Sequence, residues 1–296
     1  MPAYSEYTIS LPGEVTIGLS STGELAIAEH EQLLLGAYLP EVEIVSGISS
    51  EVEQVVQHLE SDDKSLRQGK HEIEIKDTWN GQFPMDLPHL LYGIARASWI
   101  RRNLFPVHAA CTEGAVTTLL PGNSGVGKST VVMELALHRG QKIVSGNTTL
   151  VAFEDGAINT VAGTQIMTLK TQDFAESNIE PTSSVTYGDR TAFKLESAHY
   201  APGTHHIGRI ALIQLSSYAQ QWNRVEQGSA LHRLYAHFLD TAYQDVVTCE
   251  GNGLYVGQDA PENRRYLVGA LRNALQGTPV IQGLGHSHYL AEKISA

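Results

Sequence analysis

The chain has 296 residues, of which 42% are hydrophobic, and its formal net charge is -12 at pH 7. This length and apolar content are enough for a buried core larger than that of one average domain. The acidic balance argues against a general affinity for nucleic acid or anionic membrane, because both need a basic face. Two cysteines, Cys111 and Cys249, cannot build a disulfide framework, and they predict free, packed thiols in a reducing compartment.

The N-terminal residues, MPAYSEYTISLPGE, carry acids and prolines where a signal peptide needs a basic start and an apolar run. No apolar stretch approaches the length that spans a membrane. We therefore expect a cytoplasmic protein with neither a membrane nor a nucleic-acid partner. The oligomeric state cannot be read from the sequence, and a homo-oligomer is left open.

Up to about Lys76 the chain alternates short extended runs with turn signals such as Pro12-Gly13. The runs TISL, VTIGL, ELAIA, VEIVS and HEIEIK predict strands. One helix is expected to interrupt them after Ser50, where Glu53 completes a capping box. The apolar face of that helix would hold Val52, Val55, Val56 and Leu59.

A second helix is predicted to close this N-terminal part, with Arg101 and Arg102 at its C-terminus, where positive charge is favourable. We place a domain boundary near Asn103. Residues 1–103 then form an α+β segment of unknown role, and residues 104–296 form a second domain. The apolar positions of the helix are Leu90, Leu91, Ile94, Ala97 and Trp99.

After the boundary the pattern changes to strand, loop and helix, which is typical of an α/β domain. The predicted strands are VTTLL, KIV, IALIQL and DVVTC, and the predicted helices are STVVMELALHRG, which ends at Gly140, and PENRRYLVGALRNAL. LHRLYAHFL is expected to be an ordinary amphipathic helix. TTLVAFEDGAINTVAG predicts a hairpin with a three-residue turn at Glu154, Asp155 and Gly156.

Residues 122–129, GNSGVGKS, satisfy the P-loop (Walker A) pattern GxxxxGK[ST] directly after a predicted strand and at the start of a predicted helix. Glycines let backbone N–H groups turn toward phosphate oxygens, and the helix N-terminus adds positive charge. We expect Lys128 to reach the β and γ phosphates and the Ser129 hydroxyl to ligate the Mg²⁺ that bridges them. The candidate nucleotide-binding residues are Gly122, Asn123, Ser124, Gly125, Val126, Gly127, Lys128, Ser129 and Thr130.

The segment 107–151 resembles the catalytic domain of the HPr kinase/phosphorylase family and its uncharacterised relatives. The likeness rests on His108-Ala109-Ala110 before the strand, on the loop PGNSGVGKST, and on a short helix that leads to the strand KIVS. It covers about residues 105–170 and leaves out the N-terminal segment. The resemblance implies a P-loop kinase core of the phosphoenolpyruvate carboxykinase type and phosphoryl transfer to a hydroxyl. The smaller N-terminal α+β segment is predicted from the pattern of strands and helices alone.

One departure from that family concerns the acidic pair that it carries at the end of the strand KIVS. This chain has Gly146-Asn147 there. Asn147 can orient a hydroxyl or a metal-bound water, but it cannot take up a proton at neutral pH. Glu154 and Asp155 fit the hairpin turn best.

Two other residues are candidates for the missing role. Glu250 follows DVVTC, and an acid at the end of an apolar strand can complete a magnesium site. His108 is a candidate base or phosphate-side donor, because the ordinary pKa of histidine lies in the useful range. The alternatives are a loop acid for Glu250 and a packed histidine for His108.

Further cations are candidates to neutralise the transferred phosphoryl group, namely Lys170, Arg190, Arg209 and Arg224, and the sequence does not choose among them. Thirteen histidines include the pairs His205-His206 and His286-Ser287-His288. They do not predict zinc, because neither cysteine nor a spaced second pair accompanies them.

These features lead to three hypotheses for function. The first is a kinase that transfers the γ-phosphoryl group of ATP, with Mg²⁺, to a hydroxyl on a peptide, protein or small metabolite, with GTP as the alternative donor. The second is a nucleotide-binding regulatory protein or pseudokinase, motivated by Gly146-Asn147. The third is an NTPase that couples hydrolysis to movement, which ranks last because no clear strand ends in Asp.

Overall fold

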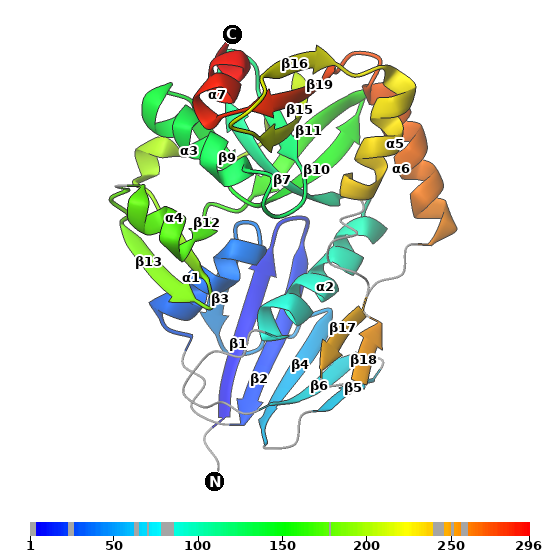
Figure 1. The fold of residues 1–296 in the computed structure, drawn as a ribbon. Coiled ribbons are helices and arrows are strands. Elements are labelled where there is room, and N and C mark those ends of the chain that lie inside the picture. Colours follow the sequence, from blue (N-terminus) through cyan, green and yellow to red (C-terminus); the bar gives the residue numbers. More distant parts are fainter. Residues whose placement is uncertain are drawn as a thin grey trace.

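A computed structural model describes residues 4–22, 27–61, 65–69, 71–77, 86–177, 179–238, 246–249, 252–255 and 260–296. The fold is mixed α/β, with a six-stranded sheet formed by the N-terminal strands and an eight-stranded sheet formed by strands that follow later in the sequence (Figure 1). Among the described residues, no helix combines the length and apolar character needed to cross a bilayer.

The N-terminal sheet has the strand order β3-β1-β2-β4-β6-β5. Its strands are β1 (Tyr4–Leu11), β2 (Val15–Thr22), β3 (Glu43–Ser46), β4 (Gln54–Glu60), β5 (Ser65–Gln68) and β6 (Glu72–Asp77). Helices α1 (Glu29–Tyr38) and α2 (Asp86–Arg101) pack on this sheet through one apolar cluster. Leu35 and Trp99 bury their side chains there completely. The sheet is therefore closed on one face by two helices.

The helix predicted after Ser50 is wrong, because those residues form strand β4. This strand pairs in parallel with β2 and with β6. Val56 and His58 are buried on alternate positions, which is the period of a strand, and valine packs well on a pleated surface. Glu53 caps no helix and instead accepts a hydrogen bond from Arg102 at 2.7 Å.

The other N-terminal expectations have mixed outcomes. The strands TISL, VTIGL, VEIVS and HEIEIK are confirmed, and α2 ends at Arg101 as predicted. Most of ELAIA lies outside the described residues. Helix α1 was not predicted, since its N-cap is Ala28 and no side chain caps it. The division at Asn103 stays a prediction, although the strands before it form a sheet of their own.

The core sheet runs in the order β11-β10-β7-β8-β15-β19-β16, with β9 paired to β7. Strands β8, β15 and β19 are parallel, and the remaining pairings are antiparallel. The strands are β7 (Phe105–Glu113), β8 (Thr118–Pro121), β9 (Lys142–Ser145), β10 (Thr148–Glu154), β11 (Ala157–Gly163), β15 (Arg209–Leu215), β16 (Gln221–Arg224) and β19 (Val280–Gly285).

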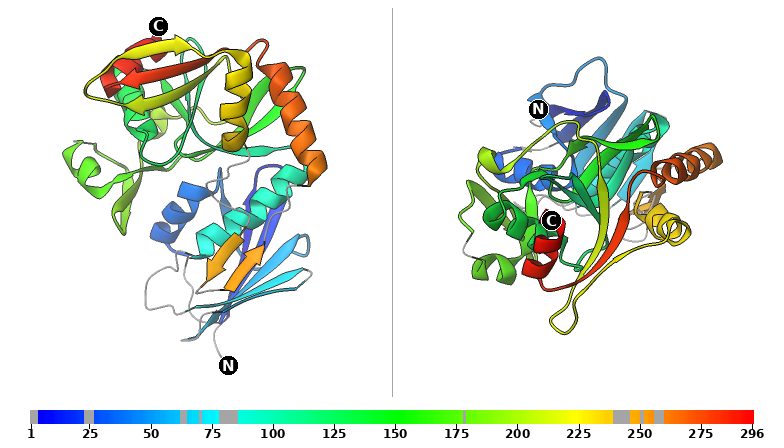
Figure 2. Two further views of the ribbon diagram at one scale, coloured as in Figure 1. Left: turned by 45° about the vertical axis from the view of Figure 1, so that its right-hand side comes forward. Right: turned by 90° about the horizontal axis from the view of Figure 1, so that it is seen from above.

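Helices cover both faces of the core sheet (Figure 2). Alternate residues of β7 point to opposite sides, so Val107 and Cys111 join one apolar cluster and Ala110 joins another. The first cluster holds α5 (Gln227–Phe238) and α6 (Pro261–Ala274), and the second holds α3 (Lys128–His138) and α7 (Ser287–Ser295). The predicted helices over these sequences are confirmed for α3, α5 and α6.

A small third sheet, in the order β12-β14-β13, lies beside α1. It consists of β12 (Met167–Lys170), β13 (Ser183–Tyr187) and β14 (Arg190–Lys194), with α4 (Thr171–Glu176) after β12 and a short 3-10 helix, η1 (Ser197–His199), beyond it. Leu33 and Ala37 of α1 pack against Ile166 and Ala192 of this region. Helix α1 therefore contacts both the N-terminal sheet and the small sheet.

Two details of the core differ from expectation. The hairpin β10–β11 turns on two residues, Asp155 and Gly156, because Glu154 still pairs with Ala157. Both turn residues have positive φ, 51° and 74°, as a tight hairpin turn requires. The predicted strand DVVTC exists as β17 (Val246–Cys249), but it pairs only with β18 (Asn252–Tyr255) among the described strands. In this hairpin β17 lies beside α2 and β18 beside β5 (Figure 1).

Gly163 offers a test of this packing. A Cβ at that position would lie 2.4 Å from the carbonyl oxygen of Val144 and 2.5 Å from Cβ of Ser145. Gly163→Ala should therefore lower the free energy of unfolding by about 1–3 kcal/mol, as overpacking does. Gly228→Ala, in α5 with open space around it, is the matched control and should not destabilise. Urea unfolding measures both, and equal stability of the two variants would contradict the packing described.

Candidate functional site

The glycine-rich loop, residues 122–127, joins β8 to α3 with the backbone geometry that its glycines allow. Gly125 and Gly127 have φ of 88° and 98°, a region that glycine tolerates best. A Cβ on Gly127 would lie 2.2 Å from Leu215, so the loop also packs closely on the end of β15. Helix α3 begins at Lys128 with no side-chain cap. The N–H groups of its first turn therefore remain available to a ligand.

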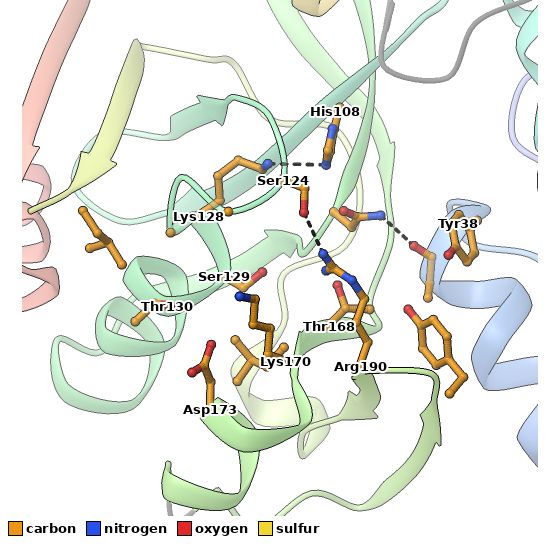
Figure 3. A pocket seen from close by; sticks show the side chains of 17 residues that line it. Tyr38, His108, Ser124, Lys128, Ser129, Thr130, Thr168, Lys170, Asp173 and Arg190 are labelled. Carbon is orange, nitrogen blue, oxygen red and sulfur yellow. Dashed lines mark hydrogen bonds between the residues drawn. The ribbon is translucent and has the colours of Figure 1, made fainter.

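This loop opens onto a cavity of about 380 Å³, a volume that suits a small-molecule ligand (Figure 3). The cavity lies where the loop, the small sheet and α1 meet. It is lined by Ala37, Tyr38, His108, Ser124, Gly125, Gly127, Lys128, Ser129, Thr130, Asn147, Thr168, Leu169, Lys170, Asp173, Tyr187, Arg190 and Leu215.

Lys128 is buried, and its ammonium group folds back over the loop. Nζ donates to the carbonyl oxygens of Gly122 at 2.5 Å and Asn123 at 3.1 Å. It also lies 3.4 Å from Nε2 of His108. Gly122 and Asn123 are thus occupied in holding the lysine, while neither lines the cavity itself. The ammonium charge of Lys128 is thus held against the backbone of the loop.

His108 is a buried histidine of β7 whose ionisation is strongly disfavoured. Burial, followed by the positive charge of Lys128, lowers the pKa of His108 from 6.5 to about 3. A histidine with this pKa is neutral at pH 7 and has little driving force to take up a proton. The low pKa favours the predicted role of His108 as a hydrogen-bonding group over its role as a base.

Asn147 connects the core to the N-terminal segment. Its side-chain Nδ2 donates to the carbonyl oxygen of Ala37 at 3.0 Å, and its amide acts to raise the pKa of His108 against the larger effects of burial and Lys128. Its backbone N–H donates to Thr164 at 2.9 Å. The amide is therefore engaged with α1 and with the histidine. A carboxylate at this position could not donate to Ala37.

The neighbouring Gly146 is required by packing. A Cβ there would lie 2.5 Å from Sδ of Met167 and 3.0 Å from the carbonyl oxygen of Ile166. The methionine side chain can move, but the Ile166 carbonyl belongs to the backbone. An acid at position 146 would thus have to displace the chain that leads into β12. This contact explains in physical terms why one half of the expected acidic pair is absent.

Three charged side chains complete the cavity. Arg190 donates to the Ser124 hydroxyl of the loop at 2.7 Å. Lys170 ends β12, and Asp173 lies in the first turn of α4. Figure 3 shows Lys170 and Asp173 on the side of Ser129, and Arg190 nearer to α1. Asp173 is the one carboxylate among the described lining residues, and no local pattern distinguishes it from other surface acids.

The remaining cationic candidates are elsewhere. Arg209 donates to the carbonyl oxygen of Lys293 in α7 at 3.2 Å, and Arg224 belongs to β16. Neither residue lines the cavity. Of the three arginines left open by the sequence, Arg190 is therefore the one that the fold brings to the loop, together with Lys170.

Glu250 lies outside the described residues, and the reason for choosing it no longer holds. The strand before it, β17, pairs with β18 instead of joining the core sheet. The strands that continue the parallel part of the sheet beyond β8 are β15 and then β19, which end at Leu215 and Gly285. Neither end carries an acid. Among the described residues, no three His, Cys, Asp or Glu side chains gather as a metal site.

Tyr38 and Tyr187 are lining residues that the sequence did not reveal. Burial raises the pKa of Tyr38, which Tyr187 and Arg190 act to lower, so its phenol stays protonated at neutral pH. Tyr187 precedes a hairpin turn, Gly188-Asp189, whose turn residues were the available signal. Tyr38 comes from α1, far away in the chain, and no local pattern could place it here.

Comparisons with known proteins give little further information. No protein-family model matches the sequence. No curated protein matches it either. Among solved structures, the chain is similar to the Hpr(Ser) kinase/phosphatase from Coxiella burnetii, with 11% identity, a TM-score of 0.31, and coverage of 64% of this chain and 91% of that chain. A likeness this distant carries no inference about activity, which has to come from the residues of the cavity.

The low pKa of His108 makes stability depend on pH. The pKa of His108 is about 3 in the folded chain and 6.5 in the unfolded chain, so below pH 6.5 the unfolded chain binds a proton at this residue and the folded chain does not. Lowering the pH from 7 to 5 should therefore reduce the free energy of unfolding by about 2 kcal/mol through His108.

His108→Gln, which keeps a hydrogen-bonding side chain, should remove that part of the loss in urea unfolding measured at the two pH values. The exposed His206→Gln is the control and should lose as much stability as the wild type. An identical pH dependence in His108→Gln and the wild type would contradict the burial of a neutral His108.

Proposed function

We propose that this protein binds a nucleoside triphosphate with Mg²⁺ in the cavity and transfers its γ-phosphoryl group to a hydroxyl. The observation that carries the proposal is the charge of the cavity. Its described lining holds Lys128, Lys170 and Arg190 against the single acid Asp173, in a chain of net charge -12. Three cations beside an uncapped helix start suit a polyanion such as a triphosphate.

Each part of the loop has a role in this proposal. Backbone N–H groups of the loop and of the first turn of α3 hold the phosphate oxygens. Lys128 exchanges the carbonyl oxygens of Gly122 and Asn123 for oxygens of the β and γ phosphates. ATP is the donor that we propose first, and GTP is the alternative.

The oxygen ligands of Mg²⁺ would come from two side chains of the cavity. Ser129 offers a hydroxyl and Asp173 a carboxylate, and both line the side of the cavity where Thr130 also lies (Figure 3). Hard oxygen ligands of this kind are what Mg²⁺ prefers, with water and phosphate oxygens completing its shell. When bound, Mg²⁺ supplies neutralisation of the charge on the β and γ phosphates.

Transfer itself asks mainly for positioning and charge neutralisation. The acceptor oxygen bonds to the γ phosphorus, the bond to the bridging oxygen breaks, ADP leaves with that electron pair, and the acceptor proton passes to a phosphoryl oxygen. A loose transition state needs little help from a base at the start of this step. Arg190 and Lys170 neutralise the transferred group, so turnover is slow but real without the acidic pair. The acceptor is a hydroxyl of a peptide, a protein or a small metabolite.

A second function, nucleotide binding without transfer, is favoured by one specific observation. The strand that carries the acidic pair in the resembled family ends here in Gly146 and in an Asn147 that is engaged by Ala37 and His108. Consumption of ATP by the purified protein, measured with a panel of hydroxyl acceptors, separates the two functions. An NTPase ranks third, because neither β15 nor β19, the strands parallel to β8, ends in an acid.

Thermal unfolding tests the proposed binding. A ligand present at 100 times its Kd that binds only the folded chain stabilises it by about 2.7 kcal/mol, so ATP with Mg²⁺ should raise Tm by several degrees. Lys128→Ala should lose most of this shift, and Lys76→Ala, in the N-terminal sheet, should keep it. A full shift in Lys128→Ala would place the nucleotide elsewhere.

Asn147→Asp tests the missing acid. A carboxylate ligates Mg²⁺ better than an amide does, so the Mg²⁺ concentration needed for half-maximal nucleotide binding should fall several-fold. The variant also loses the hydrogen bond to Ala37, which should cost about 1 kcal/mol of stability. Gly146→Asp is unsuitable because of its contact with Ile166.

The control for this variant is Asn159→Asp, an asparagine in the β10–β11 hairpin, which should leave the Mg²⁺ requirement unchanged. ATP turnover measured beside the Mg²⁺ titration decides between the two functions. Turnover in Asn147→Asp with none above background in the wild type would show a binding protein on a kinase-like frame.

A further inference from the structure

The last turn of α1 forms one end of the candidate site, although α1 belongs to the N-terminal segment. Ala37 and Tyr38 are the two residues before Asn103 among the described residues that line the cavity. Asn147 donates to the Ala37 carbonyl at 3.0 Å across 110 positions of sequence. The Tyr38 phenol also interacts with Tyr187 of the small sheet. The N-terminal segment is therefore joined to the site by a hydrogen bond from Asn147 and by the interaction of Tyr38 with Tyr187.

The geometry of the loop decides which end of a triphosphate faces α1. In a loop of this kind the lysine marks the β and γ phosphates. The Lys128 ammonium points toward His108, and Thr130 lies on the opposite side of the cavity from Tyr38 (Figure 3). His108 lies beside the Asn147 amide, which donates to the Ala37 carbonyl of α1. The γ phosphate of a bound triphosphate would therefore point toward α1.

Tyr38 is held firmly enough to act as a fixed surface. Its ring makes an edge contact with His89 of α2, with ring centroids 4.8 Å apart and an interplanar angle of 66°. The positive charge of Arg190 acts on its phenol, and Arg190 also donates to Ser124 of the loop. A group that draws Arg190 away from Ser124 would thus alter the surroundings of Tyr38 directly.

We propose that α1 is the surface against which the γ phosphate and the acceptor hydroxyl meet, so that the N-terminal segment distinguishes a triphosphate from a diphosphate and contacts the acceptor through Tyr38. This inference rests on the proposed function. In-line transfer brings the acceptor in from the side opposite the leaving oxygen, which is the side of α1. Two phenols, the Asn147 amide and the Arg190 guanidinium line that side. They suit a hydroxyl compound that is neutral or anionic near its hydroxyl.

Hydrogen exchange of backbone amides tests the inference on the full chain. The probes are ADP with Mg²⁺ and the non-hydrolysable ATP analogue AMPPNP with Mg²⁺, each at saturating concentration. Residues 122–130 should be protected by both nucleotides. Residues 29–38 should be protected, by about fivefold or more in exchange rate, with AMPPNP alone. Equal effects of the two nucleotides on α1, or no effect on α1 while the loop is protected, would overturn the inference.

The same experiment separates this inference from the proposed function. If neither nucleotide protects residues 122–130, the proposed function fails, and the inference fails with it. If residues 122–130 are protected but the exchange of residues 29–38 is the same with ADP and with AMPPNP, the protein binds nucleotide and the proposed role of α1 is wrong.

Two variants locate the effect in the side chains. Arg190→Met should lower the preference for AMPPNP over ADP by about tenfold in equilibrium binding, as the loss of a charge-assisted hydrogen bond does. Arg224→Met, a matched arginine outside the cavity, should leave the preference unchanged. Tyr38→Phe keeps the ring contact with His89 but removes the phenol oxygen that lines the cavity beside Tyr187, and it should abolish the protection of α1 that AMPPNP produces. An unaltered preference in Arg190→Met or unaltered protection in Tyr38→Phe would contradict the proposed contacts.

Discussion

The buried charge of Lys128 is the constraint around which the candidate site is built. An ammonium group out of water must be compensated, and here the carbonyl oxygens of Gly122 and Asn123 do so. The same charge helps to keep His108 neutral, and His108 in turn lies beside the Asn147 amide. A triphosphate would offer the lysine stronger partners than two carbonyls. The proposed nucleotide would therefore act on a chain of contacts that already reaches α1.

Two contacts disfavour an acidic pair at positions 146 and 147. A Cβ at position 146 would lie 2.5 Å from Sδ of Met167 and 3.0 Å from the Ile166 carbonyl oxygen, and Asn147 donates to the Ala37 carbonyl, which a carboxylate cannot do. The charged side chains of the cavity come instead from the small sheet and α4, which supply Arg190 and Asp173. The slow transfer that we propose depends on these charges.

Local patterns in the sequence predicted what depends on local chemistry. The strand–loop–helix unit around Lys128 and the amphipathic helices were found because glycine, lysine and apolar spacing act over a few residues. The helix expected after Ser50 failed because parallel pairing with β2 and β6 outweighed a capping pattern. Tyr38 and Asp173 escaped notice because the fold alone brings them to the loop. The partner of Asn147 lies 110 residues away, a distance that no periodicity spans.

A crystal structure with AMPPNP and Mg²⁺ would show where the triphosphate lies and what Lys128 contacts. We expect the β phosphate within hydrogen-bonding distance of backbone N–H groups between Gly125 and Ser129. We also expect Nζ of Lys128 on phosphate oxygens instead of the Gly122 carbonyl, and the γ phosphate directed toward Arg190 and α1. A nucleotide bound elsewhere, or a Lys128 still held by the loop carbonyls beside a bound triphosphate, would contradict the proposed binding.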